Sequence, residues 1–285
     1  MKRHLLTSTA ALAAALLAPH VSHAADWSDT AISLRAGSQF REPFNANEIR
    51  KDIIGLTHAS GYKYGTNFFN VDFLLSDSKD PAGKGSTEGA QEAYVVYRHT
   101  LDLAKVTGSP YKWGLVRGMG VVAGFDVNTK TDAGYNSKKR MLVAGPVLML
   151  DVPGFVNVGL LQLWESNAPF NTFSGVATPR YNYAPHPMLN LTWGIPFTIG
   201  SAPLKFSGFA NYITAKGKNE FGADTAPETN IDMQLMWDLT QGAKHGFLVG
   251  LQYQYWNNKF GNDASGLAGG GATAKTPMLR VEYHF

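Results

Sequence analysis

The stretch that decides the fold is TPMLRVEYHF, residues 276–285, at the carboxyl end of the chain. Its last seven residues alternate in polarity, with Leu279, Val281, Tyr283 and Phe285 apolar and Arg280, Glu282 and His284 between them. Successive side chains of a β-strand point to opposite faces, so this pattern predicts a strand with one apolar and one hydrated face. A closing strand of this kind is typical of bacterial outer-membrane β-barrels, and it also fits the last strand of a soluble barrel or sandwich.

The opposite end of the chain has the features of a secretory signal, which we place at residues 1–24. A basic start at Lys2 and Arg3 precedes an Ala/Leu run over residues 5–18, and Ser22-His23-Ala24 is a small-x-small cleavage site. The apolar run is too short for a membrane-spanning helix, which needs about 20 residues. We therefore expect a signal peptide followed by one mature domain, residues 25–285.

Composition narrows the class of protein. The chain has no cysteine, which excludes disulfides, thiolate chemistry and a lipid anchor on a first cysteine. Its 30 glycines, 12% aromatic residues and only 16% charged residues suit many strands joined by loops. The net charge of +3 is small and no dense Lys/Arg cluster occurs, so we expect no nucleic-acid polymer as a partner.

Segments with a two-residue period recur along the whole mature chain, separated by clusters of Gly, Pro, Asn, Asp and Ser. They predict twelve strands, at residues 30–41, 50–60, 66–78, 91–103, 112–127, 138–150, 154–166, 186–196, 203–216, 228–239, 245–257 and 276–285. An even number of strands keeps both ends of the chain on the periplasmic side. The predicted fold is therefore all-β, a 12-stranded antiparallel transmembrane β-barrel in the bacterial outer membrane.

The lengths of the connections give an independent test of this topology. Outer-membrane barrels alternate long extracellular loops with short periplasmic turns. Counting from the first strand, the extracellular loops are expected at residues 42–49, 79–90, 128–137, 167–185, 217–227 and 258–275. The two longest connections both fall on the extracellular side, whereas a soluble sandwich has no reason to sort its loops in this way.

The polar faces of the strands are expected to line the barrel interior. Arg or Lys at the bilayer midplane on the lipid side costs about 2–4 kcal/mol, so charged faces must turn inward and make the interior polar and hydrated. Residues 112–127 and 138–150 are exceptions, because both of their faces are apolar, as in a buried soluble strand. Pro146 removes one ladder hydrogen bond there and indicates a bulge.

Two sequence stretches suggest a family. THASGYKYGTNFFNVDF, residues 57–73, has a turn from Gly61 to Gly65 followed by Asn67, Phe68 and Phe69, and AYVVYRHTLDLAKVTG occupies residues 93–108. These stretches resemble the Tsx-type family of nucleoside-specific outer-membrane channels, in particular its OmpK-like branch, and the order of strands fits over most of the mature chain. The resemblance implies a twelve-stranded monomeric barrel with a narrow pore.

The inward faces contain candidate solute contacts. Phe68, Asp72, Tyr94 and Arg98 could stack a planar base and bind its edge and sugar, and Arg117 and Asp232 are further residues expected in the lumen. Both charge signs are present, so strong selection for one ion charge is not expected. The competing interpretation is that these charges pair across strands and plug the lumen, with Phe68 packed at the rim.

The predicted function is an outer-membrane channel for passive uptake of small hydrophilic solutes, with nucleosides the first class to test. The alternatives are a surface-exposed barrel with a plugged lumen that acts as an adhesin or phage receptor, and a soluble periplasmic β-protein. An enzyme is disfavoured, because the histidines have no metal-ligand spacing and no nucleophile or phosphate motif occurs. Neither a cofactor nor a metal is expected. The expected partners are membrane lipid, lipopolysaccharide, a small solute and, through Phe285, the barrel-assembly machinery.

Overall fold

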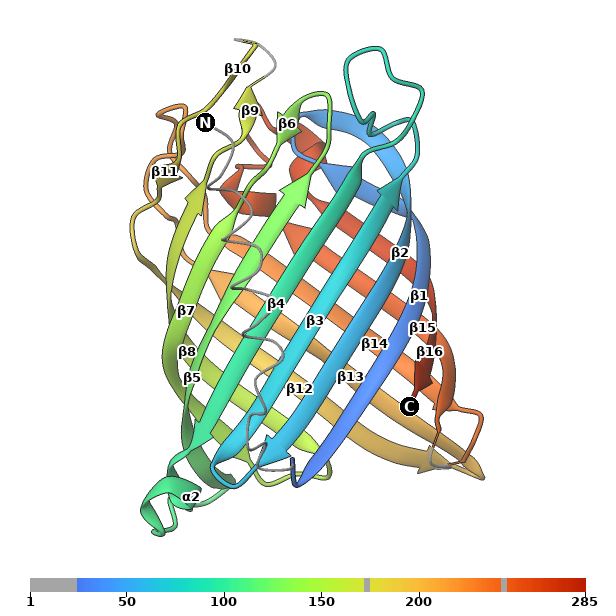
Figure 1. Ribbon diagram of the computed structural model, residues 1–285, viewed down its shortest axis with the longest axis vertical. Coiled ribbons are helices and arrows are strands. Elements are labelled where there is room, and N and C mark those ends of the chain that lie inside the picture. Colours follow the sequence, from blue (N-terminus) through green and yellow to red (C-terminus); the bar gives the residue numbers. More distant parts are fainter. Residues whose placement is uncertain (1–24, 172–174, 242–244) are drawn as a thin grey trace, which may run out of the picture.

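The computed structural model describes residues 25–171, 175–241 and 245–285, and within them twelve long antiparallel strands form one barrel (Figure 1). The predicted signal peptide lies outside these residues. The long strands are β1 (Trp27–Glu42), β2 (Asn45–Tyr62), β3 (Gly65–Ser76), β4 (Gln91–Asp102), β5 (Val116–Lys130), β7 (Arg140–Leu150), β8 (Phe155–Asn167), β12 (His186–Ile199), β13 (Ala202–Ile213), β14 (Glu228–Asp238), β15 (Phe247–Asn257) and β16 (Ala274–His284).

The first and last strands pair with each other and close the sheet. The ladder between β1 and β16 runs from Ala31 opposite His284 to Gly37 opposite Met278, and every other long strand pairs with its neighbours in the chain. Closure removes the free edges that an open sheet would expose to hydrocarbon. The prediction of a closed twelve-stranded antiparallel barrel is confirmed, and each of the twelve predicted segments overlaps one of these strands.

The connections at the two ends of the barrel differ. The longer loops gather at the top of Figure 1, which we assign as the extracellular end. They include the short strands β6 (Tyr135–Asn136), β9 (Phe170–Asn171) and β10 (Val176–Ala177), which form a small sheet, β11 (Tyr181–Asn182), and the 3-10 turns η1 (Lys259–Gly261) and η2 (Gly269–Ala272). The periplasmic end includes one helix, α2 (Leu103–Thr107), which Asp102 caps through the backbone N–H of Ala104.

The loop expected at residues 42–49 is not present. β1 and β2 continue their pairing up to Glu42 opposite Asn45, and Phe44 makes the tight turn with a φ of 64°. The reason is that the alternation of side chains continues through Ile49 and Lys51, both of which are buried. The first extracellular connection is therefore a hairpin that stands above the neighbouring strands.

The outward faces of the strands are apolar at the middle of the barrel. Leucines there are well exposed, among them Leu34, Leu160, Leu251 and Leu279, at 53–68%. By strand register, the charged side chains on outward-facing positions of the twelve long strands lie toward the ends of the barrel. Toward the extracellular end they are Arg41, Glu48, Arg50, Asp52, Arg140 and Lys275, and at the periplasmic end Arg117. An apolar belt between two charged rims is the surface that a bilayer requires.

Aromatic side chains lie at both rims of this belt. Trp113 and Tyr283 are about half exposed near the periplasmic end, and Trp164 is about half exposed toward the extracellular end of β8. Trp193 lies on the outward phase of β12 and is buried against Phe206, whereas Trp256 donates a hydrogen bond to Glu228 inside the barrel. No helix of the described chain is long and apolar enough to span a bilayer.

The barrel interior is less polar than the sequence predicted. Val122, Met141, Val143, Val147, Leu161, Leu163 and Met188 form an apolar cluster, each at most 8% exposed, on the inner faces of β5, β7, β8 and β12. The two stretches that are apolar on both faces are explained by this packing, since one face contacts lipid and the other contacts this cluster. Pro146 does not create a bulge; the β7–β8 ladder keeps its register and is interrupted between Ala144 and Val147.

A charge on the apolar belt tests this arrangement. We expect Leu160→Arg, at the middle of β8, to lower the free energy of unfolding by about 2–4 kcal/mol, because the guanidinium would face hydrocarbon. Thr129→Arg, outward at the extracellular end of β5, is the control and should cost about 0–1 kcal/mol. Urea titration of protein refolded into lipid vesicles measures both, and equal costs would contradict the assignment of the belt.

Candidate functional site in the barrel lumen

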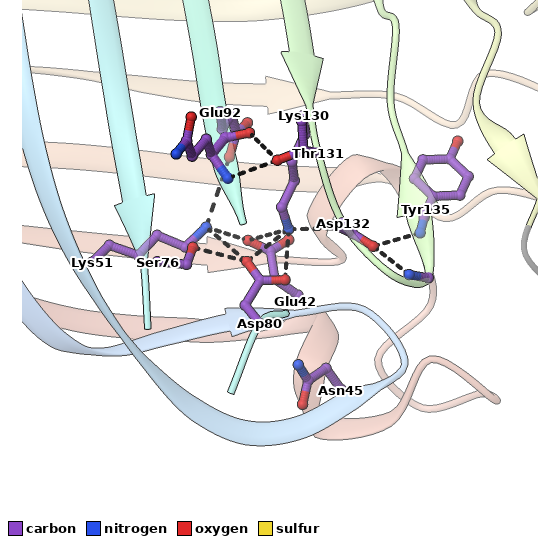
Figure 2. A network of polar contacts seen from close by, with 12 residues as sticks. Glu42, Asn45, Lys51, Ser76, Asp80, Glu92, Lys130, Thr131, Asp132 and Tyr135 are labelled. Atoms are coloured by element: carbon purple, nitrogen blue, oxygen red, sulfur yellow. Dashed lines mark hydrogen bonds and ion pairs between the residues drawn. The ribbon is translucent and has the colours of Figure 1, made fainter. Parts of the chain in front are cut away.

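Charged side chains fill one side of the extracellular mouth (Figure 2). We define the mouth cluster as Glu42, Lys51, Asp80, Glu92, Lys130, Asp132 and Lys259. The Lys51 ammonium is 1% exposed and lies 2.6 Å from Glu42, 3.7 Å from Glu92 and 3.8 Å from Asp80. Four carboxylates and three ammonium groups compensate one another here, which is what allows charges to stay buried.

Three members of the mouth cluster, Asp80, Asp132 and Lys259, come from loops. Asp80 follows β3 and is held by the hydroxyl of Ser76 and by backbone hydrogen bonds with Asp77 and Ala90. Lys259 lies in η1 and donates to the backbone carbonyl of Arg41 at 2.9 Å as well as to Glu42. Burial lowers the pKa of Lys259, and the negative charge of Glu42 opposes this effect. These ion pairs therefore draw two extracellular loops inward over the lumen.

A second charged group lies near the same end, toward β8 and β12. Lys216 donates to Glu165 at 2.7 Å and its ammonium lies 4.2 Å from the centre of the Tyr183 ring. Tyr183 and Tyr135 both donate to Glu220, and burial raises the pKa of each of these two hydroxyls. Both tyrosines therefore remain neutral donors at physiological pH.

Opposite charges also meet about halfway along the lumen, in a set that we call the mid-lumen cluster: Arg35, Asp72, Asp232, Arg280 and Glu282. Arg35 pairs with Asp72, and Arg280 pairs with Glu282. Asp232 accepts from Gln252 at 2.6 Å and interacts electrostatically with Arg35, Arg280 and Asp72. These residues come from β1, β3, β14 and β16, so the cluster reaches from one wall of the barrel toward another.

Tyr94 and Arg98 share one partner on the inner face of β4 and β5. The Arg98 guanidinium lies 2.5 Å from the carboxylate of Asp126, and the Tyr94 hydroxyl donates to the same carboxylate at 3.1 Å. Phe68 lies directly opposite Arg98 in the β3–β4 ladder and is 41% exposed. The structure thus brings Phe68, Tyr94 and Arg98 together on one wall.

The remaining candidates lie apart from this wall or already have partners. Asp72 and Asp232 belong to the mid-lumen cluster. Arg117 is the extra residue of a β-bulge, because Val116 pairs with Leu150 and Gly118 pairs with Met149. Its exposed side chain lies at the periplasmic end, on the same alternation as the outward residues of β5. Sequence alternation alone could not locate this bulge.

A row of asparagines crosses the opposite wall, and sequence reasoning did not single it out. Asn190, Asn211 and Asn230 are direct neighbours in three successive strands, and Asn190 donates to Asn211 at 2.6 Å. Asn157 lies on the adjacent strand β8, opposite Thr192. The buried amide oxygens of Asn157 and Asn230 accept no hydrogen bond from the described residues. We call these four residues the amide row. The sequence feature that could have revealed it is an asparagine on the polar face of each of the four strands.

The lumen is therefore equipped to bind and orient polar molecules. Its groups are neutral amides, aromatic rings and charges that are mostly compensated. Among the described residues, no group of three or more His, Cys, Asp or Glu side chains is arranged to hold a metal ion.

The closed barrel, its apolar belt and its two charged rims define the class: this chain is a bacterial outer-membrane β-barrel. Among solved structures it is similar to the translocator domain of the autotransporter NalP from Neisseria meningitidis, with 13% identity, coverage of 98% of this chain and 97% of that one, and a TM-score of 0.50.

Two further solved barrels are more distant. They are the β-domain of the Bordetella autotransporter BrkA, with 10% identity, coverage of 91% and 99%, and a TM-score of 0.40, and the KdgM porin, with 9% identity, coverage of 90% and 98%, and a TM-score of 0.38. No family model and no curated protein matches the chain. At these identities the likeness concerns the fold alone.

The mouth cluster can be tested by removing one charge. We expect Lys51→Met to lower the free energy of unfolding by about 3–5 kcal/mol, because Glu42 and its acidic neighbours lose a buried counter-charge. Arg41→Met is the matched control, since the Arg41–Glu48 pair is exposed and should be worth about 1 kcal/mol or less. Urea unfolding in detergent micelles compares the two, and a smaller loss for Lys51→Met than for Arg41→Met would contradict the role of the cluster.

Proposed function

We propose that this protein is an outer-membrane channel that conducts small hydrophilic solutes passively, with nucleosides as its preferred class. The observation that supports this proposal best is the amide row. Amides offer hydrogen-bond donors and acceptors without net charge, so they suit a neutral polar solute better than an ion. The pairing of charges elsewhere in the lumen also favours a neutral solute, because it leaves little net electrostatic field to attract or repel ions.

The preference for nucleosides rests on the wall formed by β3 and β4, which lies across the lumen from the amide row. Phe68 and Tyr94 present aromatic rings on the inner face, and an aromatic face stacks well on a planar base. Arg98 lies beside them, and the amide row lies on strands across the barrel, where it can bind a sugar or the edge of a base.

The width of the lumen limits the rate of transport. A twelve-stranded barrel is intermediate between eight-stranded barrels filled by side chains and sixteen-stranded barrels with an open aqueous channel. Here the mouth cluster and the apolar cluster occupy part of the cross-section. We therefore expect single-channel currents well below those of the large porins.

The competing function is a plugged barrel that serves as an adhesin or phage receptor. The burial of the mouth cluster favours it, because Asp80 and Lys259 hold two extracellular loops over the lumen. The amide row does not favour it, since a barrel that only displays loops has no use for buried amide oxygens without a hydrogen-bond donor, such as those of Asn157 and Asn230. Whether the protein acts as a monomer and whether Phe285 addresses the assembly machinery stay predictions.

Conductance in planar lipid bilayers tests the channel and its solute separately. We expect purified protein to give small stepwise currents that millimolar nucleoside reduces in a saturable way. Replacing Asn211 by Leu should weaken this block about five-fold, the effect of one lost hydrogen bond of about 1 kcal/mol. Gln162→Leu is the matched control, because Gln162 faces lipid on β8 and should leave the block unchanged.

The outcomes separate the two functions. No current from protein that still shows a folded, heat-modifiable band on a gel would contradict the channel and favour the plugged barrel. Current without nucleoside block would leave the channel in place and remove the nucleoside preference. Equal block in the Asn211 and Gln162 variants would remove the amide row from the solute path.

A further inference from the structure

The outer surface of the barrel is hollowed at the extracellular end of the seam between β1 and β16. The ladder that closes the barrel ends at Gly37 opposite Met278, and a shift of register follows in β1 between Gly37 and Phe40. Ser38 and Gln39 consequently have no paired residue in β16. Two hollows lie along this part of the seam, one above the other, and they face away from the lumen.

The upper hollow is polar and charged. It is lined by Gln39, Arg41, Glu48, Gly270, Thr273 and Lys275. Arg41 is paired with Glu48 at 2.7 Å, and Arg50 just below is paired with Asp52 at 3.2 Å. Lys275 is exposed and has no acidic partner among the described residues. Three cations thus face two carboxylates, and the excess charge is positive.

The lower hollow is mainly apolar. It is lined by Ala36, Gly37, Ser38, Arg50, Leu251, Pro277, Met278 and Leu279. Leu251 and Leu279 are adjacent on β15 and β16 and are among the most exposed leucines of the barrel, at 64% and 68%. The small residues Ala36 and Ser38 on β1 leave space beside them. An extended hydrocarbon chain fits such a surface.

The order of the two hollows matches the depth profile of the outer leaflet. Tyr255 is paired with Lys275 and Tyr253 with Pro277, so two outward tyrosines lie beside the boundary between the hollows. Tyrosine is enriched at the level of lipid headgroups. On β2, the outward face changes from Ile54 to Asp52 and Arg50 at the same boundary. The charged hollow therefore lies at headgroup level, and the apolar hollow lies at the level of the acyl chains.

We propose that this seam groove is a binding site for lipopolysaccharide, the phosphorylated, multiply acylated glycolipid of the outer leaflet. Arg41, Arg50 and Lys275 contact a phosphate of its lipid anchor, and one acyl chain lies along Leu251 and Leu279. Arginine and phosphate form strong charge-assisted hydrogen bonds, and Glu48 and Asp52 hold the two guanidinium groups in place at the rim. The proposal concerns the outer surface and is independent of the solute that the lumen takes.

Native mass spectrometry of the whole barrel in detergent tests the site, with purified lipid A as the probe. We expect wild-type protein to bind one lipid A, and the triple variant Arg41→Ser, Arg50→Ser, Lys275→Ser to bind it at least ten-fold more weakly. The charge-matched control is Lys138→Ser, Arg140→Ser, Lys218→Ser at the extracellular end on other strands and loops, and it should bind like wild type. A heat-modifiable band on a gel verifies that each variant is folded.

Two further probes define the chemistry. Lipid A without its phosphates should bind wild type as weakly as intact lipid A binds the triple variant. Replacing Leu251 and Leu279 by Asn should weaken binding while leaving the charges intact. Equal binding by the two triple variants, or equal binding of phosphatidylglycerol and lipid A to wild type, would overturn the proposal in favour of a general attraction of anionic lipid. Dimers of the barrel that the Arg41/Arg50/Lys275 variant abolishes would overturn it in favour of a second copy of the chain.

Discussion

The structure depends on the backbone ladder that joins β1 to β16. In hydrocarbon an unpaired N–H or C=O costs several kcal/mol, so a sheet with free edges could not remain in the membrane. Pairing the first strand with the last removes both edges at once. Once the sheet is closed, the alternation of side chains leaves only two environments, lipid and lumen. This is why the two-residue alternation in the sequence produces an apolar belt on the outer surface and a lumen with both polar and apolar side chains.

Closure also encloses a lumen whose inward side chains have to be packed or paired. A twelve-stranded barrel encloses more space than eight strands do and less than a wide porin, so inward side chains largely meet one another. Two kinds of contact result. On β5, β7, β8 and β12 the inward residues are apolar and pack together, whereas elsewhere carboxylates and cations approach within hydrogen-bonding distance. The amide oxygens of Asn157 and Asn230 accept no hydrogen bond from the described residues, which is why the amide row carries the functional proposal.

The sequence predicted all twelve strands, because alternation is a local property and each strand reports it independently. It did not predict what depends on contacts between distant strands. Residues 138–150 looked ambiguous because nothing local shows that Val143 would meet Leu163 inside the barrel. Arg117 was expected in the lumen, but it lies on the outward phase of β5 together with Val121 and Val127. The amide row needed the registers of two ladders, since Asn190, Asn211 and Asn230 become neighbours only when β12, β13 and β14 are aligned.

The mouth cluster has a consequence for how the barrel assembles. Glu42 contacts Lys51, nine residues away, and Lys259, 217 residues away. The nearer pair forms as soon as the first hairpin exists, but the third cation arrives only when the end of the chain has been placed. Contacts of such long sequence separation form slowly, because the chain entropy of the intervening loop is lost first. Until Lys259 arrives, the four carboxylates of the mouth cluster face only two cations, so this end of the barrel reaches its final charge balance only with the last strands.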